Sequence, residues 1–273
     1  MNNRSSGGKH FAGAVKEAGR AVIAAFSTFS VIPTPRIEWS PAALKGMLGA
    51  LPLVGCAIGL AGYLWYLIAG ALALPQILTA AVLTILPPAL SGAIHMDGFC
   101  DTVDALCSFG DMEKKRAILK DPHIGAFAAI GTGCYLLLYF ALCASLPLRT
   151  DMIVLFGLTH VLSRVAGGLA SALLPVTNRE GMLRTFREDA SSGNVIALAV
   201  FGVISLAAAA VLSPLAAALF LPAGAGVFFY VKRTARKHFG GMSGDLAGFG
   251  ITLAEIAFLA VLVLAERMAA LWF

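Results

Sequence analysis

The stretch "ILTAAVLTILPPALSGAIHMDGFCDTVDA", residues 77–105, decides how the chain must fold. Its first eighteen residues, 77–94, carry no charged side chain. An apolar run of this length is typical of a membrane-spanning helix, which needs about 20 residues. The run then meets three aspartates, Asp97, Asp101 and Asp104, spaced four and three residues apart. Because charge is costly at a membrane boundary, these carboxylates are candidates for function.

The whole chain has the composition of a polytopic membrane protein. Of its 273 residues 59% are hydrophobic and 13% are charged, and the mean hydropathy is +0.84. Soluble domains carry about 25% charge, so an ordinary soluble fold is excluded. We expect an all-α helical bundle of about seven transmembrane helices, at 47–70, 76–95, 125–146, 151–174, 194–212, 214–231 and 249–267.

This bundle and the segment before it form one predicted membrane domain over residues 1–273. Residues 1–46 form a cytoplasmic or interfacial N-terminal segment, and the transmembrane bundle occupies 47–273. Within the first segment "AVIAAFSTFSVIP" (21–33) is apolar but short, and it holds serine and threonine. It predicts a short interfacial or re-entrant helix rather than a span.

The placement of Lys and Arg predicts the orientation in the membrane. Six lie in the first 46 residues, and eleven more lie in three later loops, at 114–120, 179–187 and 232–237. The opposite side holds only Arg149 and Arg267. Since positive charge marks cytoplasmic loops, the N-terminus and these loops are predicted to be cytoplasmic. The expected location is the bacterial cytoplasmic (inner) membrane, with the lipid bilayer as a partner.

The three aspartates form a candidate metal site. On a helix Asp97, Asp101 and Asp104 fall within about 60° of arc, where their charges repel one another. A divalent cation removes that conflict, and Mg²⁺ or Mn²⁺ prefers carboxylate oxygens and often also holds substrate phosphates. The alternative is a solvated helix end.

The next loop adds a basic run and a turn. The basic run contains four cations: Lys114, Lys115, Arg116 and Lys120. It suits phosphates or anionic lipid headgroups, or it only sets the topology. In "DPHIG" (121–125), Asp121 is expected to cap the next helix or to join the metal cluster, with His123 beside it.

Two later segments carry further charges inside predicted spans. Arg164 lies within 151–174, four residues after His160, and needs an acidic or phosphate partner. The glycine-rich "GGMSGDLAGFGITLAE" (240–255) holds Asp245 at the start of a helix, where such a turn can cradle phosphate or pack helices closely. Glu255 lies about two turns deeper and needs a metal or Arg164 as its partner.

These stretches also resemble a known family. "HMDGFCDTVDA" (95–105), "AILKDPHIGAFAAIG" (117–131), "SRVAGG" (163–168) and "GGMSGDLAGFGITLAE" resemble, in order, the motifs of cobalamin synthases, the adenosylcobinamide-GDP ribazoletransferases. The sequence departs from the family pattern at Ala105, where the family has glycine. The resemblance implies a membrane phosphotransferase of the last cobamide (vitamin B12) assembly step. It would join adenosylcobinamide-GDP to α-ribazole or its 5′-phosphate, release GMP and use Mg²⁺ as cofactor.

The resemblance also implies roles for individual residues. The expected metal ligands are Asp97, Asp101 and Asp104, with Asp121 and Glu255 completing the shell or pairing with Arg164. One of the three aspartates, or Asp245, is expected to orient or deprotonate the attacking hydroxyl. The expected substrate-binding residues are Arg164, Lys114, Lys115, Arg116, Lys120, His123, His95 and Ser243.

Two other functions fit parts of the sequence. A CDP-alcohol type phospholipid phosphotransferase also has clustered aspartates at a cytoplasmic boundary. Its pattern continues with Ala-Arg, however, whereas this sequence has Ala105-Leu106 and lacks the arginine. A cation- or proton-coupled transporter would use the same carboxylates as ion ligands, yet the sequence lacks the internal repeats of most such proteins. The sequence predicts small-molecule partners and no nucleic acid, and it leaves a homo-oligomer open.

Overall fold

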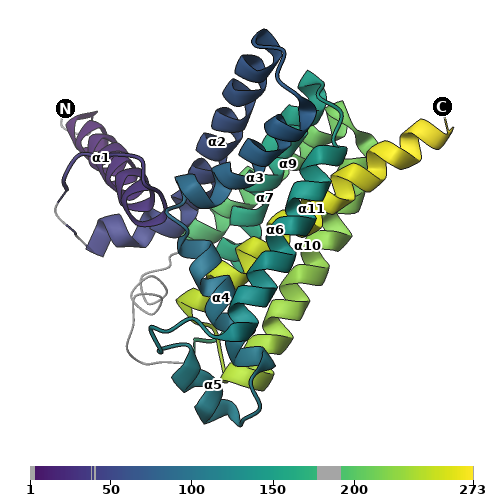
Figure 1. Ribbon diagram of the computed structural model, residues 1–273. Coiled ribbons are helices and arrows are strands. Elements are labelled where there is room, and N and C mark those ends of the chain that lie inside the picture. The colour runs from purple at the N-terminus through teal and green to yellow at the C-terminus, as the bar shows by residue number, and fades with distance from the viewer. Residues whose placement is uncertain (1–3, 38, 40, 177–191, 273) are drawn as a thin grey trace.

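The fold is a bundle of long helices (Figure 1). The computed structural model describes residues 4–37, 39, 41–176 and 192–272. In these ranges the sole β-type pairing is an isolated bridge between Val176 and Met242. The helices are α1 (Arg4–Phe29), α2 (Pro41–Ala71), α3 (Gln76–Leu90), α4 (Ile94–Cys107), α5 (Met112–Ile118), α6 (Ala126–Ser145), α7 (Thr150–Leu173), α9 (Ser192–Leu212), α10 (Pro214–Thr234), the π-helix η1 (Ala235–Phe239) and α11 (Gly244–Trp272).

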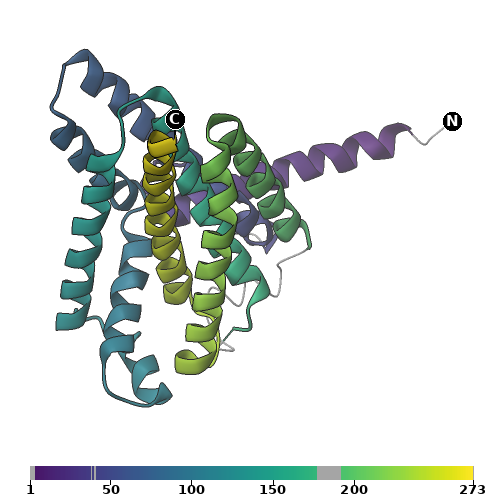
Figure 2. The same cartoon turned by 90° about the vertical axis from the view of Figure 1, so that its right-hand side faces the viewer.

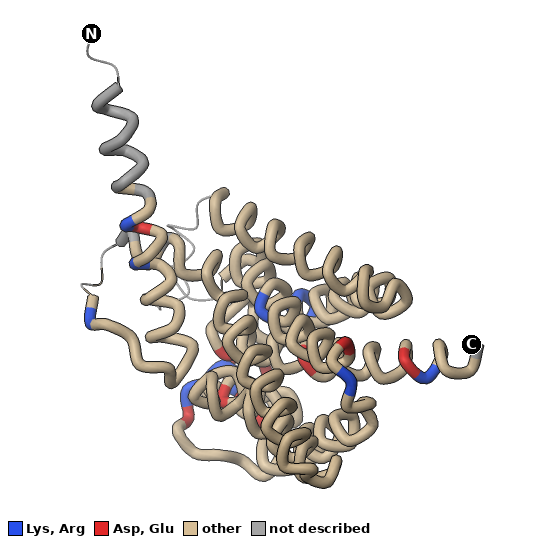
Figure 3. The backbone as a smooth tube through the Cα atoms, turned by 90° about the horizontal axis from the view of Figure 1, so that it is seen from above, with Lys and Arg blue, Asp and Glu red and all other residues tan. Residues whose placement is uncertain are grey.

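The helices confirm the predicted polytopic membrane fold. In the part of the chain that the structure describes, six helices are long and apolar enough to cross a membrane. The total is seven if the bent pair α3 and α4 counts as one span. Long stretches of the chain contain no Lys, Arg, Asp or Glu (Figure 3). Helix α7 forms the centre, since most of its residues are buried and it packs against α2, α9, α10 and α11.

The predicted continuous span at 76–95 is wrong, because the chain breaks between α3 and α4. The two helix axes meet at 89°. Gly92 and Ala93 at the break have φ values of 62° and 59°, in the left-handed region that turns a chain out of a helix. Helix α4 then runs on through Ala105 to Cys107, so the three aspartates do lie on one uninterrupted helix.

The N-terminal helix is longer than predicted. Instead of a short element at 21–33, α1 extends over 26 residues and ends at Phe29. It projects to one side of the bundle (Figures 1 and 2) and is not among the candidate spans. Its later turns pack against α2 through the buried Ala21, Ala24 and Ala25. Beyond it, the Val31 N–H donates to the Leu90 carbonyl (2.9 Å), so the segment rests on the α3–α4 break.

The last two predicted spans are also too short. Helix α10 continues to Thr234 and then through η1 to Phe239. The basic residues at this end are therefore helical, and their long side chains can reach the polar surroundings. The chain reverses at Gly240, whose φ is 70°. Helix α11 starts at Gly244, where the Ser243 hydroxyl accepts a hydrogen bond from the Leu246 N–H (3.3 Å).

Helices α4 and α11 touch backbone to backbone, and this contact positions the acidic residues. A Cβ at Gly98 would lie 2.6 Å from the Asp245 carbonyl oxygen, and a Cβ at Gly248 would lie 3.0 Å from the His95 carbonyl oxygen. The Thr252 hydroxyl also donates to the His95 carbonyl (3.2 Å). Small residues of this kind allow close helix packing in membranes. The start of α11 is thereby held beside the aspartate helix.

This contact yields a stability prediction. Gly98→Ala should lower the free energy of unfolding by about 1–3 kcal/mol, because the added methyl group must push α11 away. The matched control is Gly133→Ala in α6, where a Cβ meets no atom within 4 Å and alanine favours the helix. Thermal unfolding of both variants in detergent measures the difference. Equal midpoints would show that the contact between α4 and α11 is not tight.

Candidate active site

The three aspartates occupy the outer face of α4. The inner face of this helix is buried and carries His95, Gly98, Phe99, Thr102 and Ala105. On the opposite face Asp97 is exposed, while Asp101 and Asp104 are half-buried. The predicted stripe of three carboxylates is therefore present, and it faces away from the packed core.

A fourth carboxylate, from the first turn of α11, joins this stripe. Asp97, Asp245 and Asp104 all lie close enough to Asp101 to repel its negative charge. Asp97 acts on Asp245 in the same way. Asp245 is half-buried and accepts a long hydrogen bond from the Ser243 hydroxyl (3.5 Å). Two helices therefore bring four carboxylates to one surface.

Asp104 differs from the others because it lies at the N-terminus of α6. Its carboxylate contacts Gly125, the residue that precedes this helix, and accepts a hydrogen bond from the Ala128 N–H (3.4 Å). The N-terminus of a helix favours negative charge. Asp104 therefore has a stabilising partner within the protein, whereas the carboxylates of Asp97, Asp101 and Asp245 repel one another.

The remaining carboxylates fit a divalent cation of the Mg²⁺ type. Across the described ranges no three His, Cys, Asp or Glu side chains converge closely enough to enclose a metal ion. Mg²⁺ does not require such a cage, since it commonly binds one or two carboxylates together with water and substrate phosphates. The mutual repulsion of Asp97, Asp101 and Asp245 is the condition that a bound cation relieves. The metal role of these residues stays a prediction.

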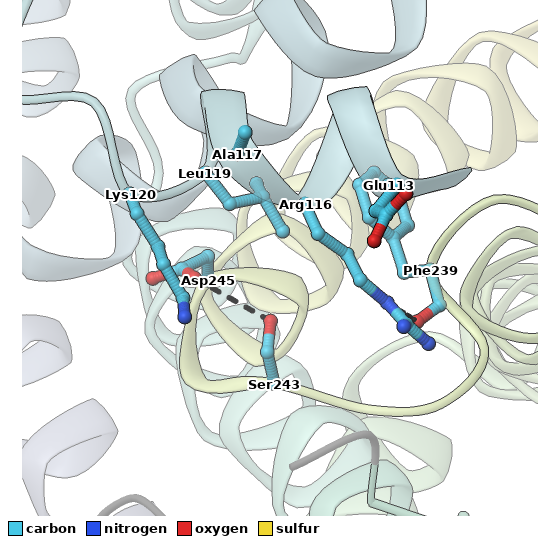
Figure 4. A pocket seen from close by; sticks show the side chains of 8 residues that line it. All are labelled: Glu113, Arg116, Ala117, Leu119, Lys120, Phe239, Ser243 and Asp245. Atoms are coloured by element: carbon cyan, nitrogen blue, oxygen red, sulfur yellow. Dashed lines mark hydrogen bonds between the residues drawn. The ribbon is translucent and has the colours of Figure 1, made fainter. Parts of the chain in front are cut away.

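A cavity of about 340 Å³ opens beside Asp245 (Figure 4). It lies between α5, the end of η1 and the start of α11. Its lining is part cationic, part acidic and part apolar, and comprises Glu113, Arg116, Ala117, Leu119, Lys120, Phe239, Ser243 and Asp245. The cavity therefore combines two cationic side chains with one of the four carboxylates.

The structure brings only two of the four predicted cations into this cavity. Arg116 and Lys120 line it. The Lys114 ammonium instead donates to the Phe109 carbonyl (2.9 Å), and the Lys115 ammonium donates to the Leu106 carbonyl at the end of α4 (3.0 Å). The prediction that all four hold substrate is thus not supported for Lys114 and Lys115, which stabilise the backbone around α5.

Arg116 is held in place by the turn after η1. Its Nε–H donates to the Phe239 carbonyl (2.8 Å), and its guanidinium occupies the space where a side chain at residue 240 would begin. Glycine is required at position 240 for two reasons: its φ is in the left-handed region, and a side chain there would collide with the Arg116 guanidinium. The glycine-rich turn predicted to cradle phosphate therefore also positions a cation of the cavity.

Asp121 and His123 pair with each other on an exposed turn. The Asp121 carboxylate accepts from the His123 N–H (3.0 Å) and lies 2.7 Å from the His123 Nδ1. These hydrogen bonds lower the pKa of Asp121 below its usual value. Neither residue lines the cavity, and Asp104 rather than Asp121 lies at the start of α6. Their predicted metal and substrate roles gain no support from this placement.

Arg164 and Glu255 form an ion pair in the interior between α7 and α11. The two residues are only 1% and 5% exposed. His160 Nδ1 lies 3.2 Å from the same carboxylate oxygen, and the Tyr135 hydroxyl donates to the other oxygen (3.4 Å). The expected acidic partner of Arg164 is confirmed. Because the pair is buried, this placement does not support the predicted contact of Arg164 with substrate or of Glu255 with metal.

His95 is also buried, on the inner face of α4. It is 6% exposed and stacks on Phe29 with ring centroids 6.0 Å apart. Within the described part of the chain its Nε2 has no hydrogen-bond partner. The imidazole faces the bundle interior, so the structure does not bring His95 to the aspartates or to the cavity.

Sequence reasoning missed four residues that line the cavity: Glu113, Ala117, Leu119 and Phe239. Glu113 precedes Arg116 by three residues, so the two share one face of α5. That spacing could have predicted that Glu113 lies beside Arg116. Phe239 gave no such signal, because its place depends on the packing of η1 against α5.

The buried ion pair yields a second stability prediction. Arg164→Met should destabilise the protein by about 3–5 kcal/mol, because it leaves the Glu255 charge buried without its main partner. The double variant Arg164→Met with Glu255→Gln removes both charges and should recover much of that loss. Thermal unfolding of both variants measures the difference. A double variant as unstable as the single one would contradict this explanation.

Comparison with known proteins places this architecture in a family. The family model for cobalamin-5-phosphate synthase matches residues 21–263. A protein of Lachnoclostridium phytofermentans named adenosylcobinamide-GDP ribazoletransferase is 37% identical over 243 residues, which cover 89% of this chain and 92% of the relative. Proteins of the same name from Clostridium perfringens and Azorhizobium caulinodans are each 32% identical and cover 86% of this chain, with 94% and 92% of the respective relative.

No solved structure matches the chain. The family match includes α4, α5, α7 and the start of α11, which carry the aspartates and the cavity. It also covers well over half of the sequence, as do the relatives. The chain therefore belongs to the cobalamin-5-phosphate synthase family.

Proposed function

We propose that the chain completes cobamide assembly by joining adenosylcobinamide-GDP to α-ribazole or its 5′-phosphate. A ribose hydroxyl attacks the phosphorus that is linked to cobinamide. The P–O bond toward GMP breaks, GMP leaves, and the hydroxyl gives up its proton. Membership of the family and the names of the relatives support this reaction. The observation that carries it is the cavity in which Arg116 and Lys120 meet Asp245.

The cations of the cavity suit the leaving group of this reaction. Negative charge grows on the GMP phosphate as the P–O bond breaks. The guanidinium of Arg116 and the ammonium of Lys120 donate hydrogen bonds that strengthen as this charge grows. Arg116 is already held by the Phe239 carbonyl, so its position changes little when the substrate arrives.

The carboxylates beside the cavity have two tasks in this proposal. Asp97, Asp101 and Asp245 would hold Mg²⁺, which when bound neutralises diphosphate charge. One of the aspartates accepts the proton of the attacking hydroxyl. Asp104, which is stabilised by α6, keeps the end of α4 in place.

The site opens toward the cytoplasm in this proposal, and the host membrane is the bacterial cytoplasmic membrane. The supporting observation is that α5 and η1, which border the cavity, carry the basic residues that mark cytoplasmic loops. In this proposal adenosylcobinamide-GDP and α-ribazole or its 5′-phosphate reach the site from the cytoplasm. Assembly into a homo-oligomer stays a prediction.

An activity assay tests the reaction and the role of Asp101. Protein in nanodiscs, given adenosylcobinamide-GDP, α-ribazole and Mg²⁺, should release GMP, and a chelator should stop the release until Mg²⁺ is restored. Asp101→Asn should lower kcat by about 100-fold or more while the protein still folds. The control is Asp151→Asn, which alters a surface ion pair with Arg149 far along the chain and should stay active.

Two outcomes would contradict parts of this proposal. No GMP release from folded protein would refute the reaction itself. Turnover of Asp101→Asn near that of the unaltered protein would remove this carboxylate from the site and leave the reaction standing.

A labelling experiment tests the orientation. In a variant without its five cysteines, Lys237→Cys in η1 and Arg267→Cys near the end of α11 place single thiols at exposed positions. A membrane-impermeant maleimide should label Lys237→Cys only in inside-out vesicles and Arg267→Cys only in right-side-out vesicles. The reverse pattern would place the cavity outside.

A further inference from the structure

The cavity beside Asp245 is too small for a corrinoid but suits a nucleotide. Its volume is about 340 Å³, near the lower end of the range of small-molecule pockets. In the reaction proposed above, the only comparably small part of adenosylcobinamide-GDP is its guanosine diphosphate. The corrinoid ring must then lie outside the cavity, toward the bilayer or the surface.

The cavity has two chemically different ends. Lys120 lies with Asp245 at one end, and Glu113 lies by Phe239 at the other (Figure 4). The Arg116 side chain runs from the middle of the cavity to the Phe239 carbonyl, so its guanidinium lies at the Glu113 end. The seven residues of α5 extend about 10 Å along its axis, and Lys120 lies two residues beyond its end. That length is comparable to a nucleotide measured from its phosphates to the far edge of its base. A nucleotide can therefore lie along α5.

The place of the reacting phosphorus fixes the direction of the nucleotide. The Lys120 ammonium attracts phosphate at one end of the cavity, whereas Glu113 repels it at the other end, where the Arg116 guanidinium also lies. The reacting phosphorus also belongs beside Asp245 and the α4 aspartates, at the Lys120 end. The base then reaches the other end, where Glu113 and Phe239 line the cavity beside the Arg116 guanidinium.

Glu113 matches one base in particular. In the described part of the chain its carboxylate forms neither an ion pair nor a hydrogen bond, and the residue is exposed. A carboxylate has two oxygens that accept hydrogen bonds, and guanine presents two adjacent donors, its N1–H and its 2-amino group. Adenine has an acceptor at N1 and lacks the 2-amino group, so it would leave the carboxylate unpaired or repelled.

We propose that this cavity binds the guanosine diphosphate of the substrate lengthwise and that Glu113 selects guanine through its N1–H and 2-amino group. This inference rests on the proposed function and goes beyond it by naming the residue that reads the base. Glu113 contacts the base and not the reacting atoms, so it determines specificity rather than the chemical step.

A binding experiment with simple nucleotides tests it. Protein in nanodiscs with Mg²⁺ is titrated with GDP, with IDP, which lacks the 2-amino group, and with ADP. The unaltered protein should bind GDP about 10–100-fold more tightly than ADP, with IDP between them. Glu113→Gln should weaken GDP binding by a similar factor and remove most of the preference. Glu113→Asp, which keeps a shorter carboxylate, should retain part of it.

The sign of the Glu113→Gln effect separates base recognition from simple electrostatics. Removing a negative charge from a cavity that binds anions should by itself strengthen the binding of every nucleotide. Only the loss of a specific contact weakens GDP while ADP stays the same or improves. Glu17→Gln on the exposed part of α1 makes the same chemical change far from the cavity and should alter neither nucleotide.

Two results would overturn the inference: equal binding of GDP and ADP by the unaltered protein, or unchanged or tighter GDP binding by Glu113→Gln. The GMP-release assay keeps this failure apart from failure of the proposed function. Protein that releases GMP but does not distinguish the bases retains the reaction and loses only the role of Glu113. Protein that neither releases GMP nor binds GDP refutes both.

Discussion

A charge buried in a membrane bundle must have a partner, and the ion pair of Arg164 with Glu255 meets this requirement at the centre of the protein. The pair joins α7, the most enclosed helix, to the middle of α11. Ten residues before Glu255, the first turn of the same helix carries Asp245, which is part of the candidate site. The buried pair therefore fixes α11, and α11 in turn fixes a carboxylate about 15 Å away along its axis. The position of Asp245 at the candidate site therefore depends on the buried ion pair between Arg164 and Glu255.

Helix α4 completes this arrangement because its two faces have different tasks. The inner face packs on α11 through Gly98, so its backbone lies against that of Asp245. The outer face carries the aspartates. A helix that was acidic on both faces could not pack, and one that was apolar on both faces could not bind a cation. The close contact makes carboxylates from two helices neighbours although nearly 150 residues separate them in the sequence.

Apolar runs predicted the existence of nearly every span, yet not where each helix breaks or ends. Hydropathy stays high through residues 77–94, and it carries no information about the left-handed φ of Gly92 and Ala93. It falls at the basic end of α10 although the helix continues there. In the site, spacing predicted the aspartate stripe because helical geometry alone decides it. The choice between Lys115 and Arg116 depends on how α5 packs against η1, a tertiary contact that no local pattern encodes.

In the proposed reaction, the mixture of charges around Asp245 has a physical reason. A cavity lined only by cations would bind the diphosphate of the substrate and the phosphate of the product alike, and uniform binding does not raise kcat. Carboxylates beside the cations oppose tight binding of phosphate unless a cation lies between the two groups. Asp245 belongs both to the cavity and to the acidic surface, so in this proposal the bond that breaks lies where the two meet. Charge that moves onto the leaving phosphate then moves toward Arg116 and Lys120 and away from the aspartates, and this favours the transition state over the ground state.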